Sequence, residues 1–204
     1  NNYKNNTMFM SLYGKGGELE IPTKELEKYF TENYTNSQYI IVPKFDQTTG
    51  EALEGEALEA AKKEAQGYYD RAVKGEESFS DIMLSWEKSL TEGEEAAEHT
   101  HEEWEHDMIL RKSEASPTEK YVELVNQAAI GAPVMGEDDY YFYIILRKDV
   151  LSRPETLELY TQQLMVDMKT EEYKEKVNQW AEDVDLTLNQ ASLNLYTPKK
   201  LTLE

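Results

Sequence analysis

The chain has 204 residues and a formal net charge of −20, with 41 acidic against 21 basic side chains and no cysteine. This charge repels nucleic-acid phosphates and anionic lipid headgroups, so we expect no nucleic-acid partner and no direct lipid binding. The lack of cysteine excludes disulfides and thiolate metal sites. No apolar run approaches the roughly 20 residues that a membrane span needs. The first residue is Asn rather than Met, which suggests a trimmed sequence.

Two helices and a strand are predicted in the N-terminal part. Residues 1–13 carry apolar side chains typical of the end of a helix, and the glycines of residues 14–17 stop it. A second helix starts at residues 21–23, because the apolar residues that follow recur at helical spacing. The short run 39–42 is rich in β-branched and aromatic residues, which predicts a buried strand.

Two further helices are predicted before the middle of the chain. Residues 45–50 hold a turn signal, and a helix over about residues 52–74 ends at Gly75. Another helix starts near Ser78. Its apolar stripe, which is typical of a core position, consists of Phe79, Ile82, Met83, Trp86 and Leu90.

All three histidines of the chain lie in the acidic segment 91–107. Imidazole and carboxylate groups suit zinc or nickel, so one interpretation of this segment is a metal site. The spacing argues against it, because His101 and His106 are five residues apart and fall on poorly matched faces of a helix. We favour a solvated, mobile acidic excursion that binds no metal tightly. Residues 108–111 after it are predicted to form a strand.

A helix, a hairpin and a second helical region are predicted in the last part of the chain. Ser116 caps a helix that ends at Gly131, with Glu119 completing a capping box. Residues 133–147 then form a hairpin. Helical patterns resume near residue 155, and a break in their phase predicts a kink or a fresh start near Thr170. An alternating segment over residues 184–188 predicts extended chain.

Four segments together resemble the parvulin (PpiC-type) peptidyl-prolyl isomerase domain. Residues 39–42 and 142–145 resemble the first and last strands of that family. Residues 74–79 resemble its Gly-x-x-Phe joint between helices, and residues 130–134 resemble its approach to the final hairpin. The resemblance covers roughly residues 38–148. It implies an α+β fold, with a small, mainly antiparallel sheet and surrounding helices.

The flanking segments are similar to those of exported foldases of the PrsA and SurA type. Residues 13–17 and 25–34 resemble the lead-in to the parvulin domain in those proteins. The resemblance implies a helical chaperone-type domain made from residues 1–36 and 150–204, with its N-terminal part truncated. It implies a parvulin-like domain, residues 37–149, inserted between these two parts.

The same resemblance indicates where a substrate site lies and raises doubt about catalysis. Tyr39 and Tyr143 stand where active parvulins carry two histidines that face each other across the sheet. Asn126 stands at the phenylalanine of the proline pocket, with Tyr121 one turn earlier, and Tyr141 replaces the glycine that opens the last strand. The two strand tyrosines can hydrogen-bond each other or serve only as core aromatics. The substrate-binding positions expected from the resemblance are Tyr39, Met108, Tyr121, Asn126 and Tyr143.

Three functions from different classes follow from these observations. The favoured one is an exported folding factor that binds unfolded polypeptide, with weak or lost isomerase activity; the others are an active isomerase and a structural interaction domain. Prolyl isomerisation needs no cofactor and no metal, because it is rotation about an amide bond. The resemblance further implies an extracytoplasmic location, a membrane anchor upstream of this sequence, exported polypeptides as partners and possible homodimers.

Overall fold

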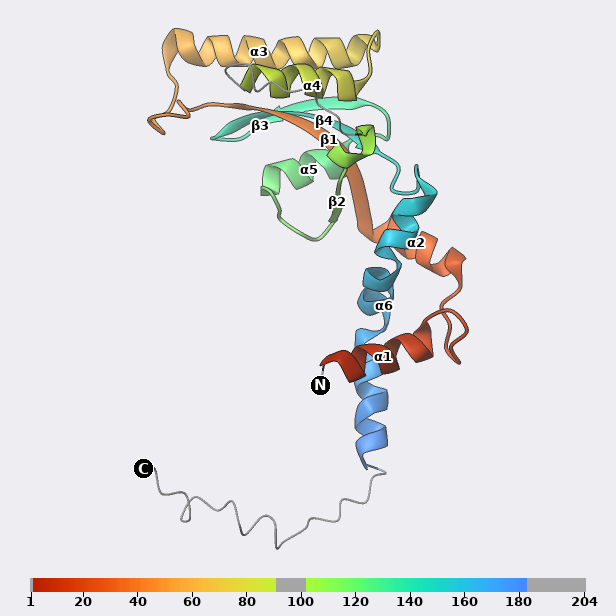
Figure 1. Cartoon of the computed structure of the whole chain (residues 1–204). Coiled ribbons are helices and arrows are strands. Elements are labelled where there is room, and N and C mark those ends of the chain that lie inside the picture. Colours follow the sequence, from red (N-terminus) through yellow and green to blue (C-terminus); the bar gives the residue numbers. More distant parts are fainter. Residues whose placement is uncertain (1, 91–101, 183–204) are drawn as a thin grey trace, which may run out of the picture. The chain divides into compact units, whose positions relative to one another are not determined.

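The computed structural model describes residues 2–90 and 102–182 and has an α+β fold, as the sequence predicts. Within these ranges a four-stranded antiparallel sheet is surrounded by helices (Figure 1). None of the helices described combines the length and the apolar character that crossing a membrane requires. The elements in chain order are α1 (Asn2–Tyr13), α2 (Thr23–Asn33), β1 (Tyr34–Pro43), α3 (Gly55–Lys74), α4 (Phe79–Leu90), η1 (Glu103–His106), β2 (Met108–Arg111), α5 (Glu119–Gln127), β3 (Pro133–Glu137), β4 (Tyr141–Lys148) and α6 (Pro154–Glu182).

The two apolar runs that the sequence singles out are paired strands at the centre of the sheet. The strand order is β2-β1-β4-β3, and β1 pairs with β4 along its length. In this register Tyr39 lies opposite Ile145, and Ile41 lies opposite Tyr143. The prediction that these segments are neighbouring strands is therefore confirmed. Because successive side chains of a strand point to opposite faces, the two strands together give the sheet one aliphatic and one tyrosine-rich face.

Helices α3 and α4 cover the aliphatic face of the sheet (Figure 1). Ile40 of β1 and Ile144 of β4 are fully buried there. They pack against Ala65 of α3 and Ile82 of α4. Helix α3 ends where predicted, because Gly75 adopts the left-handed conformation (φ 65°) that closes a helix without strain.

Helix α5 covers the opposite face of the sheet. Its buried side chains, Tyr121 and Val125, pack against Tyr143 and Ile145 of β4. The predicted capping residue is wrong: Thr118, not Ser116, begins the helix, and its side-chain oxygen accepts the N–H of Tyr121. Thr118 lies three residues before that N–H, which is the spacing that an N-cap side chain needs.

Helix α6 also corrects an expectation. It runs without a break from Pro154 to Glu182, so the phase change near Thr170 does not start a new helix. The side-chain oxygen of Thr170 donates to the carbonyl of Val166, one turn earlier, which keeps this polar group satisfied inside the helix. The extended segment predicted over residues 184–188 lies outside the described residues.

The chain divides into two compact units, one formed by residues 22–161 and the other by the chain before and after them. In the smaller unit, Tyr173 packs its ring edge-on against Phe9, and the Tyr13 hydroxyl donates to Glu172 at 3.1 Å. In the larger unit, the ring of Phe30 stacks on that of Tyr160. The domain boundaries expected from the resemblance, after residues 36 and 149, stay a prediction.

Candidate functional site

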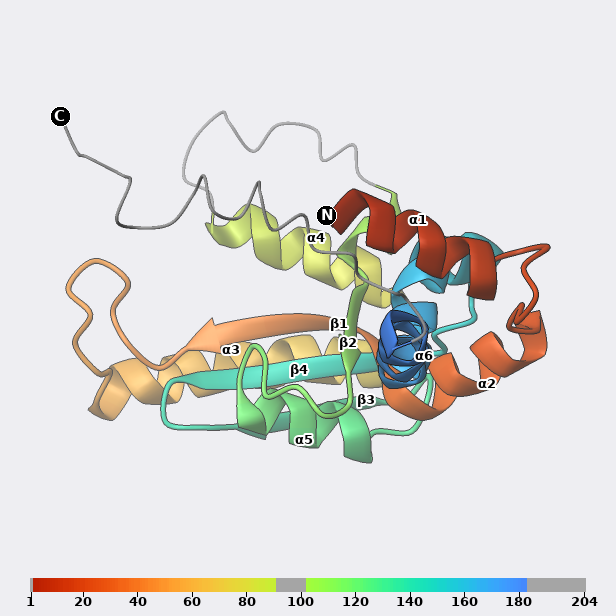
Figure 2. The same ribbon diagram turned by 90° about the horizontal axis from the view of Figure 1, so that it is seen from below.

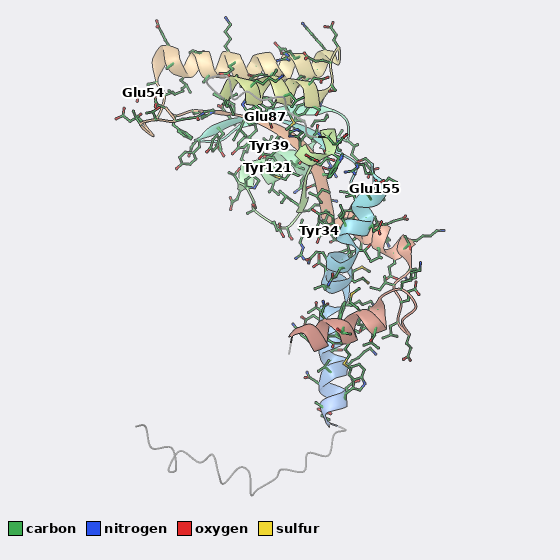
Figure 3. All side chains as sticks on the ribbon, in the orientation of Figure 1. Tyr34, Tyr39, Glu54, Glu87, Tyr121 and Glu155 are labelled. Atoms are coloured by element: carbon green, nitrogen blue, oxygen red, sulfur yellow. The ribbon has the colours of Figure 1, made fainter. Side chains whose placement is uncertain are left out.

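Four tyrosines meet on the face of the sheet that α5 covers. We call Tyr39, Tyr121, Tyr141 and Tyr143 the tyrosine cluster. The ring centroids of Tyr39 and Tyr121 are 5.4 Å apart, and those of Tyr121 and Tyr143 are 6.3 Å apart. Tyr39 and Tyr121 lie together between the sheet and α5 (Figure 3). The two strand tyrosines share a face as expected, and the ring of Tyr121 lies beside each of them.

The hydroxyl groups of Tyr121 and Tyr143 bond to residues outside the cluster. Tyr143 donates to Asp138 Oδ2 at 2.6 Å, and its oxygen lies 3.0 Å from Thr118 Oγ1. Tyr121 shares a 2.7 Å hydrogen bond with Ser37 Oγ. Among the described residues, the Tyr39 hydroxyl has no hydrogen-bond partner, and its ring is half-buried. Of the two alternatives left open by the sequence, a hydrogen bond between Tyr39 and Tyr143 is not formed.

Burial and hydrogen bonding fix the protonation states of this cluster at neutral pH. Burial raises the pKa of Tyr121 to about 12, and burial together with the bond to Asp138 raises the pKa of Tyr143 to about 12. Burial alone raises the pKa of Asp138, but the bonds from the Tyr143 hydroxyl and from the backbone N–H groups of Tyr140 and Tyr141 lower it overall. Tyr121 and Tyr143 are therefore neutral phenols, and Asp138 is a carboxylate that already accepts from the Tyr143 hydroxyl and from two backbone N–H groups.

The other two predicted site residues lie in different surroundings. Met108 is half-buried at the start of β2, opposite Ser37, on the same face as the cluster. Asn126 is exposed and donates to the carbonyl of Lys112 at 3.4 Å. Its amide is not buried against the sheet, because one residue along a helix turns the side chain by about 100°, and the substrate-binding role expected of Asn126 stays a prediction. Because Val125 is buried against the sheet, the next side chain, Asn126, faces away from it.

A groove that sequence analysis missed runs between α4 and β1, and we call it the α4 groove. In Figure 2, α4 lies beside β1, on the side of that strand away from β4. Three cavities of about 390, 490 and 510 Å³ lie along it, and Trp86 lines all three. The sequence assigns Trp86 to the core. Its half-buried ring does pack against the core, and it forms the wall of the groove as well.

The end of the acidic segment is built into the fold. The carboxylate of Asp107 accepts hydrogen bonds from the buried amides of Asn36 (3.0 Å) and Gln38 (2.9 Å) and from the ammonium of Lys148 (2.9 Å). The expectation of a solvated excursion is therefore wrong at Asp107, whose side chain is only 7% exposed. A buried carboxylate with three donors is satisfied without solvent.

The histidines do not form a metal site within the described residues. His106 Nδ1 lies 3.4 Å from Glu87 Oε1 of α4, and His99 and His101 lie outside those residues. No group of three or more potential ligands is found in the part of the chain that the structure describes. The proposed absence of tight metal binding by residues 91–107 stays a prediction.

No family model and no curated protein matches this sequence. Among solved structures, the chain is similar to the crystal structure of PrsA from Bacillus subtilis, with a TM-score of 0.41 and 13% identity over 91% of this chain and 61% of that one. It is also similar to the foldase protein PrsA from Streptococcus pneumoniae str. Canada MDR_19A, with a TM-score of 0.37 and 11% identity over 91% of this chain and 63% of that one. The chain thus spans little more than three fifths of the length of these structures.

Proposed function

We propose that the chain is part of an exported folding factor that binds unfolded polypeptide and has weak or absent prolyl isomerase activity. The observation that carries this proposal is the state of the tyrosine cluster. Of the positions expected from the resemblance to bind substrate, Tyr121 and Tyr143 are 1% and 2% exposed, and Tyr39 is half-buried. Tyr143 already uses its hydroxyl on Asp138 and Thr118.

Filling the cluster opposes catalysis for a physical reason. An isomerase accelerates rotation only through contacts that are stronger with the twisted amide than with the planar one. Such contacts need a pocket for the proline ring and polar groups that are free to reorient as the carbonyl loses its resonance. Tyr121 and Tyr143 occupy the space, and their hydrogen bonds hold them in place. Binding an unfolded chain needs neither feature.

The α4 groove supplies the open apolar surface that binding of an unfolded polypeptide needs. The cavity beside Ile41 is lined by Pro43, Phe45, Trp86 and other apolar or aromatic side chains. Open apolar surface of this kind accepts varied segments. The net charge of −20 helps to keep complexes with sticky polypeptides soluble.

The remaining parts of the proposal rest on the resemblance in sequence. We place the protein outside the cytoplasm, with its membrane contact through an anchor upstream of this sequence and with exported polypeptides as partners. A homodimer is compatible with this arrangement. The proposed activity requires no cofactor.

Two assays on one sample test this proposal. We expect cis-to-trans release of an X-Pro peptide, followed by a coupled protease, to stay near the uncatalysed rate, while the chain suppresses aggregation of an unfolded client. The double variant Tyr39→His/Tyr143→His is the comparison. A wild-type rate similar to that of ordinary parvulins restores the enzyme hypothesis. Failure to suppress aggregation at client-to-chain ratios near one removes the folding-factor hypothesis.

One observation favours an active isomerase as the second candidate. Tyr39 lines a cavity of about 510 Å³, and its hydroxyl has no hydrogen-bond partner among the described residues. This hydroxyl is available to a substrate carbonyl. If the wild-type chain catalyses isomerisation, Tyr39→Phe abolishes the rate in this second hypothesis, and Tyr140→Phe, which removes an exposed phenol, leaves it unchanged.

A further inference from the structure

Half of strand β1 has a sheet partner on one side only. Strand β2 pairs with residues 34–37 and begins at Met108, whereas β4 pairs with β1 as far as Pro43. Over residues 38–43, therefore, one edge of β1 carries no strand within the described parts of the chain. An unpaired edge presents a row of backbone donors and acceptors that another extended chain can use. We call residues 38–43 the open edge.

The register fixes which backbone groups point outward from the open edge. The N–H of Lys112 donates to the carbonyl of Asn33, so odd residues of β1 point to the β2 side. The N–H of Lys44 donates to the carbonyl of Tyr140, so even residues point to β4. Alternation along the strand then directs the N–H and C=O groups of Tyr39 and Ile41 into the groove.

Pro43 agrees with this assignment. It is the next odd residue, so its nitrogen also faces the open edge, where no strand requires an N–H group. Proline is tolerated in a strand at positions of this kind and is excluded from those that must donate to a neighbour. The open edge therefore offers the N–H and C=O groups of two residues, followed by a residue that can only accept.

The cavities of the α4 groove follow the same two-residue step. One cavity lies against Tyr39 and Met108, and the next lies against Ile41 and Pro43. In an antiparallel pair, a residue directly opposite Tyr39 or Ile41 has its side chain on the same face as they do. Each cavity reaches around the edge of the sheet, since it is lined both by an odd-numbered residue of β1, on the face under α5, and by Trp86 of α4. A strand added at the open edge would thus place alternate side chains beside successive cavities.

The charges around the groove favour some extended polypeptides over others, according to the charge that the polypeptide carries. Glu87 and Glu105 line the cavity beside Tyr39 together with His106 and with Asp107, whose charge is paired with Lys148, and Glu64 lines the third cavity. No lysine or arginine lines any of the three. An occupant with a basic residue at the Tyr39 end is favoured by this field, and an acidic one is repelled.

We propose that the open edge binds an extended segment of an unfolded polypeptide by strand addition, with alternate apolar side chains in the α4 groove and a basic residue beside Glu87 and Glu105. This inference rests on the proposed folding-factor function and specifies its binding mode. The six residues of the open edge span about 20 Å at roughly 3.3 Å per residue, which suits a segment of about six residues. A second copy of the chain is disfavoured as the occupant, because it carries the same charge of −20 and the same proline at its edge.

Backbone methylation of a peptide tests this binding mode directly. The probe is a blocked heptapeptide in which valine and threonine alternate, with one terminal lysine, titrated into the full chain by calorimetry. Methylating the nitrogens of the valines removes the N–H groups that face the open edge, whereas methylating those of the threonines leaves them intact. We expect the first change to weaken binding at least about tenfold, since two or more hydrogen bonds are lost, and the second to weaken it less than about threefold. Equal effects of the two peptides overturn strand addition.

Variants of the chain locate the same site. Ile41→Pro removes an outward N–H, Trp86→Ala removes the shared wall, and the exposed Ile130→Ala is the control. We expect the first two variants to bind the unmethylated peptide at least about fivefold more weakly than the wild type, and the control variant to bind it with unchanged affinity. Replacing the lysine of the peptide by glutamate is expected to weaken binding further. Where Ile41→Pro fails to fold by circular dichroism, the methylated peptides and Trp86→Ala decide the outcome.

Further outcomes test strand addition separately from the proposed folding-factor function. Unchanged peptide affinity in Trp86→Ala, or a concentration-dependent dimer that excludes the peptide from this edge, contradicts strand addition by a client. If Trp86→Ala still suppresses client aggregation like the wild type, the folding-factor proposal stands and the open edge is not its site. If the wild-type chain binds the peptide but suppresses no aggregation, strand addition stands and the folding-factor proposal fails.

Discussion

The two faces of the central sheet come from the same strands but are held together differently. On the face under α3 and α4, the fully buried Ile40 and Ile144, which carry no polar side-chain atoms, pack among aliphatic and aromatic side chains. On the face under α5, Tyr121 and Tyr143 are equally buried, but each hydroxyl has a defined partner. The stability of the first face depends on how completely its side chains fill the core. The stability of the second face depends also on hydrogen bonds, which require a fixed orientation of each hydroxyl.

This difference has consequences for what each face can do. An apolar core tolerates substitutions that keep its volume but loses stability when a cavity is left. A buried hydroxyl must keep its partner, because an unsatisfied polar group costs free energy. The Tyr121 hydroxyl joins α5 to β1 through Ser37, and the Tyr143 hydroxyl joins β4 to the N-cap of α5 at Thr118 and to the β3–β4 turn at Asp138. The second face is therefore fixed in geometry, which suits a support for the neighbouring open edge.

The largest expected effect lies where the aliphatic face ends in polar residues. Asp107→Ala leaves the ammonium of Lys148 and the amides of Asn36 and Gln38 without their shared acceptor. We expect the free energy of unfolding to fall by about 3–5 kcal/mol, as for other broken buried ion pairs. Urea denaturation followed by circular dichroism measures this change. Asp107→Asn keeps the shape and one acceptor oxygen but removes the charge, so it is expected to cost less than Asp107→Ala, and a loss near zero in Asp107→Asn would contradict an electrostatic role.

A cavity on the aliphatic face is expected to cost nearly as much. Ile144 is fully buried on β4, so Ile144→Ala should lower the free energy of unfolding by about 2–5 kcal/mol. Ile144→Val removes one methylene and should cost about 0.5–1.5 kcal/mol. The same urea titration measures both. If the two variants lose the same amount, the claim that filled volume stabilises this face is wrong.

The tyrosine face is tested by removing single oxygens. Tyr143→Phe leaves Asp138 without its hydroxyl donor, and we expect a loss of about 1–2 kcal/mol in the free energy of unfolding. Tyr39→Phe is a matched control, because that hydroxyl has no hydrogen-bond partner among the described residues, and it should change stability by less than about 0.5 kcal/mol. Equal costs in the two variants would show that ring packing alone supports this face.

The last prediction concerns the free energy of unfolding at alkaline pH, where the same face has an effect that is absent at neutral pH. The pKa of Tyr121 and that of Tyr143 are raised to about 12 in the folded chain, against 10.0 for an ordinary tyrosine. Below pH 10 both states keep these protons, so nothing changes. As the pH rises above 10 the unfolded chain loses them first, so stability falls progressively up to about pH 12. In Tyr121→Phe the stability measured in urea from pH 9 to 11.5 should fall less steeply, and an unchanged slope would contradict this assignment.

The sequence predicts the elements better than their polar contacts. Alternating and β-branched residues identify β1 and β4, and their pairing follows from the resemblance of residues 39–42 and 142–145 to neighbouring strands. The cap of α5 at Thr118 was missed because Ser116, Pro117 and Glu119 form a stronger local signal than the contact that decides it. Asp107 was grouped with a solvated acidic segment because its three donors come from β1 and β4, about 70 and 40 residues away in sequence.

The candidate site was predictable only in part for the same reason. Periodicity places Tyr39, Tyr121 and Tyr143 on interior faces, but it does not say which hydroxyl bonds to which acceptor. Asn126 was placed in the pocket by alignment of motifs, whereas the helical phase of α5 turns it to solvent. The α4 groove and the open edge depend on β2 starting at Met108, opposite Ser37. The strand over residues 108–111 is predicted from the sequence, but its register opposite β1 follows from tertiary pairing and has no local signature.

The position of Trp86 gives the groove an optical reporter. Only three tryptophans are present in the chain, and Trp86 alone among them lines the cavities beside the open edge. Trp104 lies 4.0 Å beneath the guanidinium of Arg153, and Trp180 is partly exposed on α6. Replacing those two by phenylalanine leaves a single indole whose emission wavelength depends on the water around it. Occupancy of the groove can then be followed in real time without any label on the chain or on what it binds.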